Sequence, residues 1–476
     1  MRSIDDLSEP NINRSFGSSD KISLMDVDSI SATLRIIADQ CALQQRVTVT
    51  LADSSTLSGP RHPGWAKGGG LWWGKTIDLK AAYKQLLVRQ GGRWCSVIAV
   101  WDPASSAARL YIQATLPFGA SASVLHFNRV ARALWFVGCT DYSLAWGNFY
   151  DDYPVVEPRI TANSANLAAK GFMKILGFEV SEAAAKDLDF SEVFVALGVV
   201  FHMDQIHLGI ASISNKPARV DLAIQAAQKV HDEGGAPRRE LEALRGRLQY
   251  LEFQTFGRAG KMALRAFKDD GTGKQYKHFD DEEKKCLTWL VQWLKTSVPR
   301  NLVPNSLHRP LVLFTDGACE FEGHLKVTYG ALLYDPVDGY CAAFGAEVPQ
   351  SLSAEWAADG KKQLVGQAEL LPILVSKRHW ASRMLNRKVL CFVDNDSAKF
   401  ACIKADSDSR SSREILQAIN FEESRTQTWT WFTRVPSYSN AADLPSRLKL
   451  AETAARFGAA IEIANCPFSL LGGRWH

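Results

Sequence analysis

Residues 148–154 read Asn-Phe-Tyr-Asp-Asp-Tyr-Pro, so that two aromatic residues are followed at once by two carboxylates. A third carboxylate, Asp78, follows the short run Lys75-Thr76-Ile77. Two divalent ions about 3.5–4 Å apart can bind the attacking and leaving oxygens of phosphoryl transfer, and such hard cations prefer carboxylate oxygens. The pattern raises the hypothesis of a two-metal site at Asp78, Asp151 and Asp152. The alternatives are a solvated Asp-Asp turn and a helix-capping Asp.

A second set of four acidic residues lies between residues 310 and 450. Asp316 and Asp394 each follow a strand-like apolar run. Glu369 lies in an amphipathic helical pattern, and Asp443 follows a stretch of alternating Thr and Trp. Each acid alone has a simpler interpretation, because Asp-Gly turns are common and a helical Glu usually faces solvent. Clustered acids would repel one another strongly without cations, so the set predicts a second two-metal site.

The bulk composition is that of an ordinary globular protein. With 476 residues, 46% hydrophobic and 22% charged, the chain allows two to four domains and excludes the disordered and fibrous classes. A net charge of +4 says little about nucleic acid, which local basic patches would indicate better. The nine cysteines form no CxxC pair, which favours reduced thiols in an intracellular protein. No apolar run approaches the roughly 20 residues of a membrane span, so a soluble protein is expected, in the cytoplasm or the nucleus.

Changes in composition and periodicity divide the chain into six segments. A polar N-terminal segment is expected to be disordered, and a short segment of mixed character follows it. Alternating strand-like and helix-like patterns, typical of an α+β domain, precede a basic stretch with leucines at helical spacing. An α/β pattern and an Ala-rich tail that could add a helix complete the chain. In order, the segments are residues 1–25, 26–75, 76–213, 214–300, 310–450 and 451–476.

Two shorter patterns predict local structure. Residues 97–101 and 110–114 flank Asp102-Pro103 and predict a β-hairpin. Residues 162–176 form an amphipathic pattern stopped by Gly177, which predicts a helix.

The first acidic set lies among motifs that resemble those of reverse transcriptases. Residues 76–88, TIDLKAAYKQLLV, resemble the first palm motif, and residues 116–130, LPFGASASVLHFNRV, resemble the next. Residues 149–152, FYDD, resemble the aromatic-x-Asp-Asp hairpin, and Lys186 and Leu197-Gly198 follow in the order that this family shows. The order and spacing are more specific than any single motif. The closest resemblance is to retrotransposons of the DIRS type.

This resemblance implies an α+β polymerase domain with a palm at residues 76–213 and a basic helical thumb at residues 214–300. It implies that Asp78, Asp151 and Asp152 are catalytic, metal-binding carboxylates. Because successive strand side chains point to opposite faces, Asp151 is expected to bind metal more directly than Asp152.

The resemblance also implies a set of substrate-binding residues. Tyr83 would lie under the sugar of the incoming nucleotide and disfavour a 2′-hydroxyl, whereas the alternative is a core tyrosine. The thumb would bind duplex phosphates, whereas the alternative is a merely solvated helical face. The other implied substrate-binding residues are Gln85, Phe118, Gly119, Lys186, Arg245 and Arg247.

The second acidic set resembles, in chain order, the Asp-Glu-Asp-Asp site of the ribonuclease H fold. The resemblance implies an α/β ribonuclease H-like domain over residues 310–450. Many members carry a mobile His shortly before the last Asp, whereas Ser437, Tyr438 and Ser439 occupy that stretch here. The catalytic, metal-binding residues that it implies are Asp316, Glu369, Asp394 and Asp443.

Together the resemblances predict an RNA-directed DNA polymerase of a retroelement, coupled to hydrolysis of the RNA strand in RNA–DNA hybrids. They imply Mg²⁺ or Mn²⁺ as cofactor. The implied partners are an RNA template, a DNA primer, an RNA–DNA hybrid and deoxynucleoside triphosphates, with no membrane and an open oligomeric state.

In reverse transcriptases a fingers subdomain precedes the first motif and supplies basic residues for the triphosphate, so the resemblance implies a short or truncated fingers region at residues 26–75. Only 77 residues precede Asp78, and the basic residues available there for a triphosphate are Arg46, Arg61, Lys67 and Lys75. Two alternatives therefore stay open. One is a polymerase-defective ribonuclease H-type nuclease, and the other is a non-catalytic nucleic-acid-binding remnant.

Overall fold

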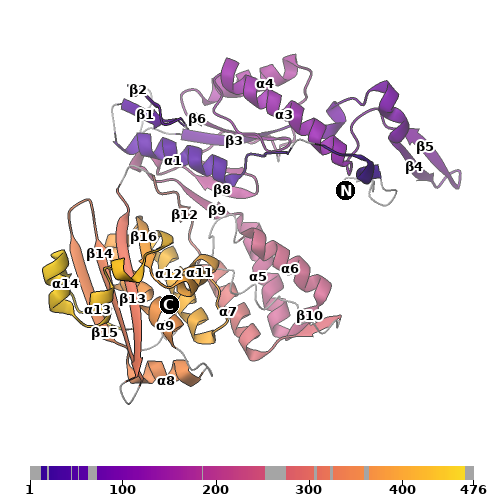
Figure 1. Cartoon of the computed structure of the whole chain (residues 1–476). Helices are drawn as coiled ribbons and strands as arrows, with labels where there is room; N and C mark the ends of the chain where they lie inside the picture. The colour runs from indigo at the N-terminus through magenta and orange to yellow at the C-terminus, as the bar shows by residue number, and fades with distance from the viewer. Residues whose placement is uncertain are drawn as a thin grey trace. The chain divides into compact units, whose positions relative to one another are not determined.

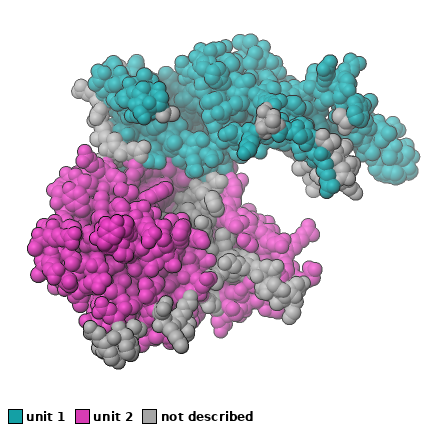
Figure 2. Space-filling view, viewed as in Figure 1, with its two compact units in different colours: residues 1–211 teal, residues 212–476 magenta. Residues whose placement is uncertain are grey.

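The structure is a computed structural model of the chain, and it divides into two compact units, Met1–Ala211 and Ser212–His476 (Figure 2). Both units mix helices with strands, which confirms the α+β class at this level. Residues 1–11 of the segment expected to be disordered, and Lys67, lie outside the described residues. The structure describes residues 12–18, 21–43, 46–51, 53–62, 72–184, 186–251, 275–304, 308–321, 325–358 and 364–466.

The first unit contains three antiparallel strand pairs and three longer helices among its described residues (Figure 1). A further pair, β7 and β8, contacts β3. The elements are η1 (Ile12–Ser15), α1 (Val27–Leu43), β1 (Arg46–Thr50), β2 (Thr56–Pro60), β3 (Trp72–Asp78), η2 (Ala82–Gln85), η3 (Gln90–Cys95), β4 (Val97–Asp102), β5 (Ala107–Ile112), α3 (Ser121–Asp141), β6 (Asp152–Pro158), α4 (Ala162–Ile175), β7 (Val193–Ala196), β8 (Val199–His202) and η4 (Ile206–Leu208).

The pair β3–β6 lies at the core of the first unit. Ile77 of β3 and Tyr153 of β6 pack against Phe127 of α3 and Phe172 of α4. An isolated two-stranded pair is marginally stable in water, so these helices supply the apolar contact that the pair needs. The predicted helix before Gly177 and the predicted hairpin around Asp102-Pro103 are both confirmed, as α4 and as β4–β5.

The second unit contains a helical part followed by a six-stranded sheet with helices. Its elements are β9 (Ser212–Asn215), α5 (Pro217–Asp232), β10 (Gly235–Pro237), α6 (Arg238–Leu251), β11 (Tyr276–His278), α7 (Asp281–Thr296), β12 (Arg300–Asn301), β13 (Leu311–Phe321), β14 (Leu325–Tyr334), β15 (Cys341–Glu347), α8 (Gln350–Ala358), α9 (Val365–His379), α10 (Ala381–Met384), β16 (Lys388–Val393), α11 (Asp396–Lys404), α12 (Arg410–Thr426), β17 (Trp429–Arg434), η7 (Ser437–Ser439), α13 (Asp443–Ser446), α14 (Leu450–Phe457) and β18 (Ala460–Ile461).

The helical part forms from α5, α6 and α7. Leu241, Leu244, Leu248 and Leu251, which the sequence places at helical spacing, are all buried in one cluster with residues of α5 and α7. Helix α7 begins with a capping box in which Asp280 and Glu283 bind one another's backbone N–H groups.

The sheet has the order β17-β16-β13-β14-β15-β18 (Figure 1). Strands β13, β14 and β15 are antiparallel, whereas β16 pairs parallel to β13 and β17 parallel to β16. Helix α9 packs on β13 and β14, and it also packs against α12. The Ala-rich tail forms the predicted extra helix, α14, and then a short strand, β18, that pairs parallel to β15. None of the described helices is long and apolar enough to cross a bilayer.

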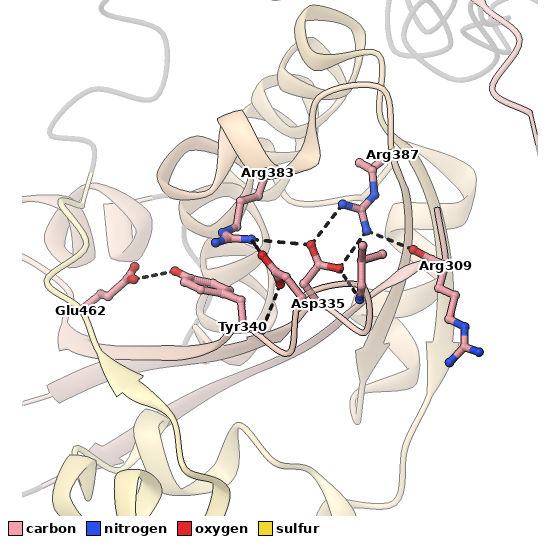
Figure 3. Close-up of polar contacts among 8 residues, drawn as sticks. Arg309, Asp335, Tyr340, Arg383, Arg387 and Glu462 are labelled. Carbon is pink, nitrogen blue, oxygen red and sulfur yellow. Dashed lines mark hydrogen bonds and ion pairs between the residues drawn. The ribbon is translucent and has the colours of Figure 1, made fainter. Parts of the chain in front are cut away.

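A network of polar contacts joins the C-terminal segment to Tyr340 and the β14–β15 turn to Arg383 of α10 and to Arg387 (Figure 3). Glu462 also contacts His379 at the end of α9, at 2.7 Å. The hydroxyl of Tyr340 donates to Glu462 Oε1 at 2.5 Å, and Trp380 Nε1 donates to Glu462 Oε2 at 3.0 Å. Arg387 donates to both carboxylate oxygens of Asp335, at 3.0 and 3.1 Å. The contacts of Glu462 attach the segment after α14 to the folded unit.

We expect Glu462→Gln to lower the stability of the protein at pH 7 by about 1–2 kcal/mol, because charge-assisted hydrogen bonds would be lost. Burial favours the protonated form, but hydrogen bonds from Tyr340, His379 and Trp380 outweigh it and hold the pKa of Glu462 below its usual value. The ionised group therefore stabilises the fold fully above the ordinary Glu pKa, and this contribution is lost progressively as pH falls from that value through the lowered pKa of the folded state. Chemical denaturation of both variants at pH 7 and pH 4 measures the difference. Glu452→Gln, at a 63% exposed side chain, is the control and should change stability little; an equal loss in both variants would contradict the assignment.

Candidate metal centres

The first acidic set meets at one end of the β3–β6 pair. Asp78 ends β3 and lies opposite Asp152, the first residue of β6, in the antiparallel register. Burial, followed by the charges of Asp151 and Asp78, raises the pKa of Asp152 to about 6. The charges of Asp151 and Asp78 therefore act on the carboxyl group of Asp152, as neighbouring acidic groups do.

Lys186 is the counter-ion of Asp78 in this structure. Its Nζ lies 2.6 Å from both carboxylate oxygens of Asp78. The next residue, Asp187, accepts from Lys170 at 2.7 Å and from Lys75 at 2.9 Å. Lys75 is 4% exposed and committed to Asp187, so it is not available to a triphosphate as the sequence suggested. These ion pairs instead fix the segment that carries Lys186.

The predicted nucleotide-pocket residues divide into two groups. Tyr83 packs edge-on against Phe118, with ring centroids 5.0 Å apart, and burial raises the pKa of Tyr83 to about 12. Gln85 differs, because its amide donates to the carbonyls of Lys80 and Glu179 and accepts from the Glu179 N–H. These contacts give Gln85 a structural role and lend no support to its predicted place in a nucleotide pocket.

The remaining predicted substrate contacts lie at two helices. Gly119, with φ of 92°, precedes α3 in a left-handed conformation that favours glycine. The side chain of Asn13 spans the same turn, donating to the Gly119 carbonyl and accepting from Ser121 N–H. Arg245 and Arg247 are exposed on α6, on the side away from its buried leucines.

The second acidic set brings three carboxylates together in the second unit. Asp316 lies on β13, Glu369 on α9, and Asp394 directly after β16. One oxygen from each lies within 4.8 Å of the other two. Parallel pairing of β13 with β16 aligns the two strands that deliver the aspartates. This is the arrangement that a metal-binding site requires.

Gly317 allows helix α9 to approach β13 closely enough for Glu369 to reach Asp316. A Cβ at this position would overlap the backbone carbonyl of Ala368. Pro372, four residues later in α9, has no N–H to donate to that carbonyl. The carbonyl of Ala368, which lies against Gly317, therefore accepts no hydrogen bond from the N–H position four residues later in α9.

Burial makes the charged forms of these carboxylates costly. Asp316 is 7% exposed and Glu369 is 5% exposed. Burial, increased by the charges of Asp316 and Asp394, raises the pKa of Glu369 to about 9. Oε2 of Glu369 and Oδ1 of Asp394 are buried and accept no hydrogen bond from the described residues. A buried carboxylate oxygen without a partner is expensive, and a divalent cation is the partner that this donor set fits.

Burial, opposed by a hydrogen bond from Ser446 and reinforced by the charges of Asp394 and Asp443, raises the pKa of Asp316 to about 6. Asp443 therefore acts on the site, although it does not belong to the close trio. Its carboxylate is 2.9 Å from Arg447 Nε, and its side chain is 40% exposed. Four predicted residues thus contribute to one site, with Asp443 at its solvent side.

Ser446 is a site residue that sequence reasoning missed. Its hydroxyl donates to Asp316 Oδ2 and lies 3.0 Å from the Asp443 carbonyl oxygen. Helix α13 brings Ser446 there because Gly330 and Gly345 leave room for its backbone, where any Cβ would collide with Pro445 or Ser446. The sequence carried a signal for it, because Ser446 and Arg447 end the pattern Asn-x-Ala-Asp-x-x-Ser-Arg at residues 440–447 and follow Asp443 at helical spacing.

The chain matches no protein-family model and no curated protein. Among solved structures it is similar to the foamy viral protease-reverse transcriptase dRH in complex with double-stranded DNA, with 14% identity and a TM-score of 0.41 over 76% of this chain and 56% of that one. It is also similar to the foamy viral protease-reverse transcriptase in complex with an RNA/DNA hybrid, with 13% identity and a TM-score of 0.41 over 83% of this chain and 51% of that one. This chain thus spans about half the length of those two proteins. Scores below 0.5 do not establish a shared fold.

We expect Glu369→Gln to stabilise the metal-free protein at pH 8 by roughly 1–3 kcal/mol, because Gln is neutral without a proton, whereas Glu369 must take up a proton when the chain folds at this pH. The folded-state pKa of Glu369, about 9, exceeds its ordinary value of 4.5. The folded state therefore holds a proton that the unfolded chain releases, and the wild type loses stability as pH rises between these values. Denaturation in EDTA at pH 4 and pH 8 should show the two variants converging at the lower pH.

Millimolar Mg²⁺ should reverse the order of stability of the wild type and Glu369→Gln at pH 8. It should raise the thermal midpoint of the wild type and leave that of Glu369→Gln nearly unchanged. Glu347→Gln, at an exposed position on β15, is the matched control and should respond to Mg²⁺ as the wild type does. An equal Mg²⁺ response in Glu369→Gln would exclude a metal site at the trio.

Proposed function

We propose that residues 310–450 form a ribonuclease H-like nuclease that hydrolyses the RNA strand of RNA–DNA hybrids. The observation that carries this proposal is the close trio of Asp316, Glu369 and the half-buried Asp394, which includes two buried oxygens without a hydrogen-bond partner among the described residues. Mg²⁺ or Mn²⁺ bound there would activate a water and stabilise the leaving oxygen of a phosphodiester. Asp443, at the solvent side, would complete the set of ligands.

The chain's own residues prepare this chemistry. Ser446 orients Asp316 by donating to its Oδ2. Gly317 lets the backbone of α9 approach β13, so that Glu369 faces Asp316. Arg447 pairs with the half-exposed Asp443. Asp316, Glu369 and Asp394 would then bind the cation. In hydrolysis the oxygen of the attacking water forms a new P–O bond and its proton passes to bulk water, while the P–O3′ bond breaks and the departing ribose 3′-oxygen takes up a proton to become a hydroxyl.

A second function is favoured by the cluster of Asp78, Asp151 and Asp152. We propose that residues 76–213 form a reverse transcriptase palm and residues 214–300 a thumb, acting on an RNA template, a DNA primer and deoxynucleoside triphosphates. Asp78 and Asp151 would hold the cations, with Asp152 in support. Tyr83, whose ring packs against Phe118, would exclude a 2′-hydroxyl. A retroelement of the DIRS type is the origin that the motifs favour.

The nuclease proposal predicts that the purified chain cleaves the RNA of a hybrid in Mg²⁺. Asp394→Asn should lower kcat by at least about a hundredfold, because even residues that only support metal ligands contribute 10–100-fold. Cleavage of a 5′-labelled RNA annealed to DNA measures it. Asp396→Asn is the matched control, because Asp396 is 46% exposed and paired with Lys399 at 2.6 Å. Hydrolysis that survives Asp394→Asn would refute the assignment.

The polymerase proposal predicts extension of a DNA primer on an RNA template in Mg²⁺. Asp151→Asn should abolish extension and leave hybrid hydrolysis intact, because the two acidic sets lie in different units. Asp141→Asn, at an exposed position ending α3, is the control. A wild type that cleaves hybrids and extends no primer would instead support the polymerase-defective nuclease.

A further inference from the structure

A hollow of about 340 Å³ lies beside Asp443, and the nuclease chemistry does not use it. Its size falls within the range of small-molecule and nucleotide sites. Residues of η7, α13 and α14 surround it, all within the second unit. Its polar lining consists mainly of Ser437, Tyr438, Ser439, Asn440, Arg447 and Arg456.

The charges in this hollow fit an anion. Arg447 is paired with Asp443 at 2.9 Å. Arg456 is exposed and forms no ion pair with the described residues; its guanidinium lies 5.4 Å from the ring centroid of Phe457. Two guanidinium groups thus face one carboxylate, which leaves a net positive charge. Guanidinium matches the geometry of phosphate oxygens, and the hydroxyls of Ser437 and Ser439 are further donors.

Tyr438 adds an aromatic surface at the same place. Its side chain is 89% exposed and contributes almost nothing to the core. A large aromatic side chain in water gains by packing against a ligand, and sugars and bases are common partners of such rings in single-strand binding. An anion site beside an exposed ring is suited to a nucleotide unit of a strand.

We propose that this hollow binds the phosphate adjacent in the strand to the scissile phosphate, which would lie at Asp316, Glu369 and Asp394. This inference rests on the proposed nuclease function. Arg456 binds its oxygens, and Tyr438 packs on the adjoining sugar or base. Asp443 connects the two sites, because it lines the hollow and its charge also acts on Asp316. A strand whose scissile phosphate lies at the carboxylates would therefore reach Arg456 with its neighbouring phosphate.

Binding of a hybrid to the full chain in EDTA, followed by fluorescence anisotropy, tests this without turnover. We expect Arg456→Gln to weaken binding about five- to tenfold, as loss of one charge-assisted contact implies. The slope of log K against log salt should fall in magnitude by about 0.9, the value for one phosphate contact. Tyr438→Ala should weaken binding, and Tyr438→Phe should leave it unchanged.

Arg425→Gln is the matched control, because it also removes one half-exposed arginine from the second unit. Arg425 lies near the end of α12. The carbonyl of the next residue, Thr426, accepts a hydrogen bond from Asn386 N–H shortly before β16 begins, whereas Asp394 follows the opposite end of β16. The control should keep the wild-type affinity and salt slope.

A single methylphosphonate placed next to the cleavage position locates the contact. It should weaken wild-type binding and add nothing to the loss in Arg456→Gln. Unchanged salt slope in Arg456→Gln, or full additivity of the two changes, would overturn the proposal. Failure of the nuclease function would look different, since the wild type would then bind the hybrid through Arg456 and cleave nothing.

Discussion

The cost of burying carboxylate charge governs the arrangement of the second unit. Asp316 and Glu369 are almost fully buried, and the pKa of both is raised. Chains ordinarily pair buried charges or replace them with apolar groups. Here the backbone instead brings them together, because Gly317 lacks the Cβ that would collide with the backbone of α9 at Ala368. Such a local conflict with stability is typical of functional sites.

The two acidic sets solve the same electrostatic problem differently. Asp78 has an internal cation, Lys186, at 2.6 Å. A metal ion at that site would have to compete with this ammonium, so its affinity there includes the cost of breaking the pair. No such competitor contacts Glu369 or Asp394 among the described residues. The nuclease-type site is therefore the stronger metal site of the two on electrostatic grounds.

Local periodicity made much of the fold predictable. The leucines of α6, the helix before Gly177 and the hairpin around Asp102-Pro103 all follow from spacing within one element. The strands that precede Asp316 and Asp394 were readable for the same reason. Contacts between distant segments could not be predicted in this way. Nothing in the sequence around Gln85 or Lys75 indicates that their partners are Glu179 and Asp187. The closeness of Glu369 to Asp316 came from resemblance rather than from periodicity.

The distribution of counter-ions within the described residues separates stability from function. Exposed acids have partners: Asp443 is paired with Arg447, and Asp396 with Lys399. Exposed pairs of this kind contribute little to stability. Glu369 is buried and Asp394 is half-buried, and each keeps one buried oxygen without a partner at the place where a cation would stabilise most. In a chain selected for stability alone, we would expect the lysine and arginine side chains beside the buried acids rather than beside the exposed ones. The arrangement is therefore best explained by a cation that the protein binds from solution. Without this cation the unpaired carboxylate oxygens lower the stability of the fold.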